Sequence, residues 1–253
     1  MVNSKKKERR MPYIKETCIT GKVVEVRKYF SPRYHPRGEK RAPRKKPTPE
    51  QMAKVNQRAA ERNLRRLMNA NFRDGDFLVK LDFFNKQGIT AEEMQKDIAT
   101  FVKKLRIKFQ GAGQEFKYIY VKEIGPRGSR HIHMMLPRCS TEILTAMWEH
   151  GGIHIDPLYS KGQYKQIAAY FIKYADKSTE TAGKLVGKRW YASRNLVKPK
   201  VKKEVVKANA YRETPKVPKG YALEPDSVVK GTSEITGYDY YFYSCMRLED
   251  DVG

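Results

Sequence analysis

Cysteine is scarce in this sequence, and its three copies are far apart. Cys18, Cys139 and Cys245 form no Cys-x-x-Cys pair, which excludes a zinc ribbon or a disulfide scaffold and favours a reducing compartment. No stretch approaches the roughly 20 consecutive apolar residues of a membrane helix. Residues 1–11 are charged and lack the apolar run of a secretory signal. A Gly-x-x-x-x-Gly-Lys-Ser/Thr run is also missing, so we expect no nucleotide cofactor and no fused ATP-driven helicase.

Positive charge is abundant and unevenly distributed over the 253 residues. The net charge is +24, of which residues 1–70 carry +15 and residues 181–220 carry +10. Residues 71–180 carry only +4, and residues 221–253 carry −5. Because binding to phosphates releases condensed counterions, this pattern favours a nucleic acid as partner. A solvated surface or a localisation signal is the alternative explanation.

The same boundaries suggest three segments. We expect a basic extension over residues 1–70 that contains a strand, an arm and a helix. A core follows over residues 71–180. Residues 181–253 would form a second extension, in which a basic segment precedes an aromatic strand that packs on the core.

Hydrophobic periodicity predicts an α+β fold. Thr90 and Glu93 form a capping-box signature, and the following apolar residues recur at helical spacing. Helices and hairpin-forming strands alternate as β-α-β-β-α-β-α, which indicates an antiparallel-rich sheet of the split βαβ (ferredoxin/RRM-like) type with helices packed on it. The predicted strands are residues 76–84, 116–124, 130–136 and 152–157, and the last helix is residues 162–176.

Two histidines in one predicted strand are candidate metal ligands. Side chains alternate between the faces of a strand, so His131 and His133 project from the same face. Glu123 ends the preceding strand, across a Gly-Pro-Arg-Gly turn. Two imidazoles and one carboxylate suit Mg²⁺ or Mn²⁺ in a site that stays open to a phosphate oxygen. Alternatively, the two histidines are half-exposed strand residues that only form hydrogen bonds.

The predicted helix over residues 162–176 carries two tyrosines one turn apart. Tyr170 and Tyr174 lie at one edge of its apolar face, with Lys173 between them toward solvent. A phenolate is a competent nucleophile at phosphorus once a cation activates it. The alternative is that both rings are ordinary packing residues at a helix edge.

Together, these motifs resemble the HUH endonucleases, and specifically the rolling-circle replication initiators (Rep proteins) of phages and plasmids. The resemblance covers about residues 75–180 and rests on Phe77–Phe84, Glu123–Leu136 and Ala169–Lys177. It implies that His131, His133 and Glu123 bind a divalent metal. Tyr170 and Tyr174 would be nucleophiles at the scissile phosphate, and Lys173 a positioning cation. The product would be a 5′-phosphotyrosyl link and a free 3′-hydroxyl.

The resemblance also implies partners and a location. The partner would be single-stranded origin DNA in the cytoplasm of a bacterial host, and unwinding and synthesis would need a host helicase and polymerase. Tyr118, Tyr120 and Trp190 could stack on unpaired bases. The candidate DNA-binding residues are the arginines Arg58, Arg62, Arg65, Arg66, Arg130, Arg189 and Arg194.

Three other functions remain open on the sequence alone. A non-catalytic DNA-binding protein would share the fold and form no covalent adduct. A transposase or relaxase would share the chemistry, although relaxases commonly place the nucleophile before the histidines. A basic ribosome-associated protein would show no metal dependence.

Overall fold

The chain divides into two compact units. The computed structural model describes residues 13–31, 46–84, 88–125, 128–159, 161–180, 188–206 and 214–248. One unit comprises residues 57–198, and the other combines residues 1–56 with residues 199–253. Both flanking segments of the chain thus contribute to one unit, because their strands pair with each other. Most of the basic arm 31–49, the tip of the turn after Glu123 and the acidic residues 249–251 lie outside the described residues.

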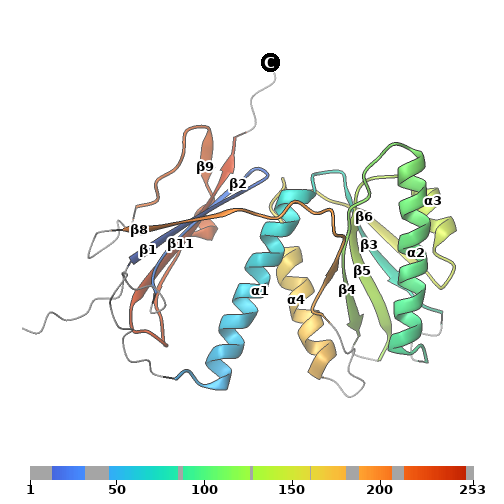
Figure 1. Cartoon of the computed structure of the whole chain (residues 1–253), viewed down its shortest axis with the longest axis horizontal. Helices are drawn as coiled ribbons and strands as arrows, with labels where there is room; N and C mark the ends of the chain where they lie inside the picture. The colour runs from blue at the N-terminus through green and yellow to red at the C-terminus, as the bar shows by residue number, and fades with distance from the viewer. Residues whose placement is uncertain are drawn as a thin grey trace, which may run out of the picture. The chain divides into compact units, whose positions relative to one another are not determined.

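The unit of residues 57–198 is built around an antiparallel sheet. Its strand order is β6-β3-β5-β4-β7, and every pair is antiparallel. The succession β3-α2-β4-β5-α3-β6 and this order are those of a split βαβ fold, which confirms the predicted fold class (Figure 1). The elements are β3 (Phe77–Asp82), α2 (Ala91–Gly111), β4 (Ile119–Ile124), β5 (Arg130–Leu136), α3 (Thr141–Met147), β6 (Ile153–Pro157), α4 (Lys165–Glu180) and β7 (Tyr191–Ala192).

Helices cover both faces of this sheet. Helices α2 and α3 lie on one face and α4 on the other (Figure 1). The first face buries Ile132, Met134 and Leu136 of β5. The second buries Met135 against α4 and against the C-terminal part of α1 (Pro49–Asn71). This alternation places His131 and His133 on the face covered by α4, as the strand period predicts.

Helix α2 forms as its sequence predicts. Thr90 accepts a hydrogen bond from the Glu93 backbone amide, and the Glu93 side chain accepts one from the Thr90 amide. This capping box satisfies two amides that the first helical turn leaves unpaired. The buried residues of the helix are those at the predicted spacing, namely Met94, Ile98, Phe101, Val102, Leu105 and Phe109.

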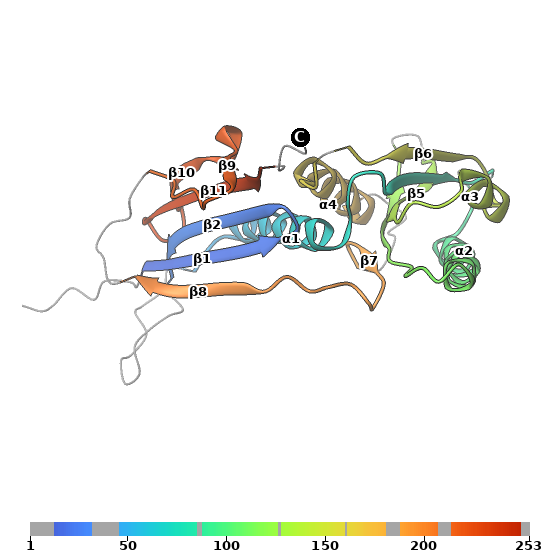
Figure 2. The ribbon, with the colours of Figure 1, turned by 90° about the horizontal axis from the view of Figure 1, so that it is seen from above.

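The second unit is also organised around a sheet, ordered β10-β11-β2-β1-β8, with β9 paired to β11. Strands from the two flanking segments lie side by side in it (Figure 2). Tyr241, Tyr243 and Cys245 of β11 pack with Val24 and Val26 of β2 in its core. The elements are β1 (Tyr13–Thr20), β2 (Val23–Phe30), β8 (Val201–Val206), β9 (Tyr221–Leu223), the 3-10 helix Pro225–Ser227, β10 (Val229–Thr232) and β11 (Asp239–Arg247).

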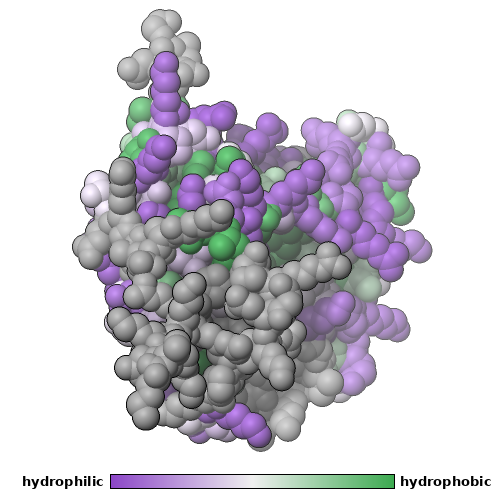
Figure 3. Space-filling model, turned by 60° about the vertical axis from the view of Figure 1, so that its left-hand side comes forward, coloured by the Kyte–Doolittle hydropathy of each residue, from purple (hydrophilic) through white to green (hydrophobic). Residues whose placement is uncertain are grey.

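The described helices are amphipathic. None of them is both long and apolar enough to cross a bilayer. The described side chains on the face shown in Figure 3 are mostly hydrophilic, with a smaller number of apolar side chains among them.

Candidate metal centre and tyrosine helix

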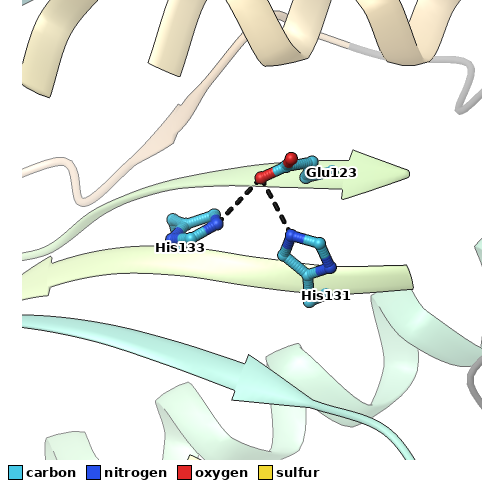
Figure 4. Close-up of side chains that lie close together, drawn as sticks. All are labelled: Glu123, His131 and His133. Carbon is cyan, nitrogen blue, oxygen red and sulfur yellow. Dashed lines mark ion pairs between the residues drawn. The ribbon is translucent and has the colours of Figure 1, made fainter. Parts of the chain in front are cut away.

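Strand register brings the carboxylate and the two imidazoles together. Glu123 of β4 lies directly across from His131 of β5, and His133 follows two residues later on the same face. The Nε2 atoms of His131 and His133 lie 2.9 and 2.8 Å from the same atom, Glu123 Oε2 (Figure 4). The pairing of two adjacent strands, rather than a loop, therefore fixes the relative positions of the three groups.

These three side chains fit a divalent cation. Their ligand atoms lie within 4.8 Å of one another, and each residue is at least nine-tenths buried. One carboxylate oxygen and two imidazole nitrogens form a mixed oxygen and nitrogen donor set that first-row and related divalent ions accept. Within the described part of the chain, this is the one group of three or more His, Cys, Asp or Glu residues with metal-binding spacing.

The electrostatics of the site keep Glu123 ionised. Burial raises the pKa of this carboxyl group, but the hydrogen bonds from His131 and His133 and the charges of the two rings lower it further. The net effect brings the pKa of Glu123 down to about 2. The carboxylate is therefore available as a metal ligand at any pH near neutrality.

Helix α4 delivers the hydroxyl group of Tyr170 to this centre. Ala168, Phe171, Ile172 and Ala175 bury the apolar face of the helix, as predicted. That packing leaves Tyr170 at the edge, where its hydroxyl donates a hydrogen bond to Glu123 Oε2 at 3.2 Å and lies 3.0 Å from His133 Nε2. The ring remains 37% exposed. A nucleophile at this position touches the metal centre and still faces solvent.

Without a cation, the surroundings of Tyr170 oppose its ionisation. Burial raises the pKa of the phenol, and the negative charge of Glu123 and the hydrogen bond to it raise the pKa further. A positive charge that neutralised Glu123 would remove two of these causes. The site is thus arranged so that ionisation of Tyr170 depends on the occupant of the centre.

Tyr174 and Lys173 occupy the next turn of α4. The rings of Tyr174 and Tyr170 are 4.4 Å apart between centroids. Lys173 is exposed, and its Nζ lies 5.8 Å from the centroid of the Tyr174 ring. The ammonium group therefore accompanies Tyr174 more directly than Tyr170.

The candidate DNA-binding arginines differ in exposure. Arg58 and Arg194 are exposed, and Arg62, Arg65 and Arg189 are half-buried. Arg130 is half-buried, and its guanidinium donates a hydrogen bond to the Ile89 carbonyl. Arg66 is only 4% exposed, on a stretch of α1 between the buried residues Leu64 and Met68. Arg66 is therefore not available to a phosphate in this structure.

The aromatic side chains expected to stack on bases also differ. Tyr120 is 4% exposed and stacks on Tyr191, with ring centroids 4.8 Å apart. Its surface is thus already covered by protein, whereas Tyr118 and Trp190 remain half-buried. Among these three, Tyr118 and Trp190 retain exposed surface for a base.

Strand β3 adds two polar residues that the sequence did not single out. Lys80 pairs across the sheet with His133, and Asp82 pairs with His131 on the side opposite Glu123. Lys80 Nζ lies 3.1 Å from Asp82 Oδ1, and His154 Nε2 lies 3.5 Å from Asp82 Oδ2. The period-2 alternation of Leu78, Lys80 and Asp82 was the available signal, but its value depends on β3 being the neighbour of β5.

Comparison with known proteins assigns the region that holds this site. Residues 78–179 match a family model described as replication-associated protein of the ORF2 type, a family of replication initiators. The matched region runs from β3 into α4 and includes the Glu123 and histidine cluster and both tyrosines. No curated protein and no solved structure shows a significant match to the chain. The match indicates a role in the initiation of DNA replication.

Proposed function

We propose that this protein nicks and rejoins single-stranded origin DNA to start and end rolling-circle replication. The observation that carries the proposal is the contact of Tyr170 with the candidate metal ligands: its hydroxyl oxygen lies 3.0 Å from His133 Nε2 and 3.2 Å from Glu123 Oε2. A nucleophile and a metal-binding group within hydrogen-bond reach of one another can act on the same phosphate. The replication-initiator match supports DNA as the substrate.

The reaction is an exchange of phosphodiester bonds. The Tyr170 oxygen forms a bond to phosphorus, the phenol proton is released, and the bond between phosphorus and the 3′-oxygen breaks. The departing 3′-oxygen takes up a proton and becomes a free hydroxyl. One phosphodiester replaces another, so the energy for rejoining is retained in the tyrosyl link, and the reaction needs no nucleotide hydrolysis.

Glu123, His131 and His133 would hold Mg²⁺ or Mn²⁺ in this reaction. A cation bound there polarises a phosphate oxygen and stabilises the charge that develops at phosphorus. The residues themselves orient the reacting groups: Glu123 and His133 direct the Tyr170 hydroxyl toward the centre, and the packing of α4 fixes the ring. The proposed roles of Tyr174 and Lys173 are a second nucleophile and a cation that positions the phosphate near it.

The grip on DNA lies outside this centre. We assign phosphate contacts to Arg58, Arg62, Arg65, Arg189 and Arg194, which keep exposed or half-exposed guanidinium groups. Arg130 would contribute at the edge of β5. A host helicase and polymerase would supply unwinding and synthesis.

Covalent capture of DNA tests the proposal. The protein is incubated with circular single-stranded DNA and Mn²⁺ and then digested, and mass spectrometry identifies the peptide that carries nucleotide. We expect the adduct on Tyr170 in the first cleavage. Tyr174→Phe should still cleave but rejoin poorly, and the double change Tyr170→Phe, Tyr174→Phe should abolish the adduct.

Tyr238→Phe is the matched control, because it removes a phenol hydroxyl from the other unit. It should cleave like the wild type. Equal adduct formation by the wild type and the double variant would refute the proposal, and so would cleavage that persists without any divalent cation.

A further inference from the structure

A groove leads away from the candidate metal centre. A hollow of about 580 Å³ begins at His133 and Tyr170 and extends over Leu78 and Lys80 of β3. Its volume lies within the range of pockets that hold small molecules or parts of larger ones. Since a reacting phosphate has to contact Tyr170, the next nucleotide of the same strand has to leave the centre through adjoining space, and this hollow adjoins it.

The hollow continues into a second one. A space of about 270 Å³ shares four lining residues with the first, namely Leu78, Asp156, Gln166 and Ile167. It extends to Tyr159, whose side chain is 78% exposed. We call the two together the β3–α4 groove, because β3 and β6 form its floor and α4 forms one wall.

The charges in the groove do not suit a phosphate backbone. Lys80 is the one Lys or Arg among its described lining residues, and its ammonium group is already paired with Asp82. Asp156 is exposed and lies in the part that both hollows share. A phosphate there would face a carboxylate, which costs free energy at close range.

The same lining suits a nucleobase. Leu78 and Ile167 offer apolar surface to the flat faces of a base, and Gln166 and Asp156 offer hydrogen-bonding groups to its edge. A carboxylate only accepts hydrogen bonds, so it pairs with the exocyclic amino groups of cytosine, adenine or guanine and not with thymine. The exposed ring of Tyr159 provides a stacking surface at the far end.

We propose that the β3–α4 groove binds the unpaired bases next to the scissile phosphate and selects among them through Asp156 and Gln166. This inference rests on the proposed function and adds to it the part of the protein that reads the nick site. It assigns sequence recognition to the near-neutral core and leaves affinity to the arginines outside it.

Selection from a random pool tests the groove. The full-length protein is incubated with randomised single-stranded DNA and Mn²⁺, and both the captured and the released fragments are sequenced. We expect the wild type to prefer amino-bearing bases over thymine at one or two positions beside the nick. Asp156→Asn and Gln166→Ala should each weaken that preference by about tenfold, the typical contribution of a good base contact, and leave other positions unchanged.

Two control variants make the same chemical changes elsewhere. Asp226→Asn alters an exposed carboxylate in the other unit, and Gln110→Ala alters an exposed amide at the end of α2. Both should select the wild-type bases. Mn²⁺ affinity should be equal in all five proteins, which shows that the centre is intact.

The outcomes separate the two proposals. If the wild type captures DNA and Asp156→Asn and Gln166→Ala select the same bases as the wild type, the groove does not read the nick site, and the nuclease proposal stands. If the wild type captures no DNA in this experiment, the proposed function fails, and this inference fails with it.

Discussion

At the scale of single residues, one carboxylate oxygen connects the parts of the site. Glu123 Oε2 is within hydrogen-bond distance of both imidazoles and of the Tyr170 hydroxyl. The carboxylate supplies the negative charge among the three ligands, so its loss should affect cation binding more than the loss of a neutral donor.

Glu123→Gln should therefore weaken Mn²⁺ binding strongly. Even partners one step removed from a metal are worth about 10- to 100-fold in affinity, so a direct ligand should cost at least that much. Calorimetric titration with Mn²⁺ measures the change. Glu115→Gln, which removes an exposed carboxylate paired with Lys117, is the control and should bind Mn²⁺ like the wild type. Unchanged affinity in Glu123→Gln would exclude this centre as the metal site.

The pKa of Glu123 also predicts an effect of acid on stability. In the folded, metal-free protein the pKa is about 2, compared with an ordinary value of 4.5. A lowered pKa in the folded state means that the ionised carboxylate stabilises the fold above pH 4.5, and that this contribution is lost as the pH falls toward 2.

Acid unfolding in the presence of a chelator, followed by tryptophan fluorescence, measures this loss. The wild type should lose more stability between pH 4.5 and pH 2 than Glu123→Gln, which has no titrating group at this position. Parallel curves for the two proteins would show that Glu123 does not contribute to the acid dependence.

At the scale of elements, the approach to β6 depends on a glycine. A Cβ atom on Gly151 would lie 2.1 Å from the carbonyl oxygen of Asp82, at the end of β3. The same carbonyl accepts a hydrogen bond from Trp148 Nε1. The neighbouring atoms belong to the backbone, so they cannot yield as a flexible side chain would.

Gly151→Ala should thus lower the free energy of unfolding of this unit by about 1–3 kcal/mol. Both tryptophans lie in residues 57–198, so urea unfolding followed by tryptophan fluorescence reports on this unit. Gly111→Ala serves as the control because nothing lies within 4 Å of its added Cβ. It should leave the urea midpoint unchanged or raise it slightly.

What could be predicted from the sequence follows the range of the interactions. The buried face of α2 and the common face of His131 and His133 depend on local periodicity, and both were predicted correctly. The neighbours of a strand depend on distant segments, so the position of Asp82 beside His131 could not be derived. Arg66 was predicted as part of an exposed stripe, but the core packs around the C-terminal half of α1 and buries it.

At the scale of the whole molecule, the net charge of +24 predicts a strong effect of salt on DNA binding. Each phosphate contact on a single strand adds about −0.7 to the slope of log K against log salt concentration. Arg58→Ala should reduce the magnitude of that slope by about this amount, measured by fluorescence anisotropy with single-stranded DNA. Gln57→Ala, at the adjacent exposed position, should not change it. An unchanged slope in Arg58→Ala would remove Arg58 from the phosphate contacts.

The pairing of β2 with β11 and of β1 with β8 has a consequence for synthesis of the chain. Strand β2 ends at Phe30, and its partner β11 begins only at Asp239. At about 5–20 residues per second, the ribosome needs roughly 10–40 s to make the intervening chain. During that time residues 57–198 can emerge complete and fold. The replication-associated region would therefore reach its structure first, while the strands that precede it wait for their partners.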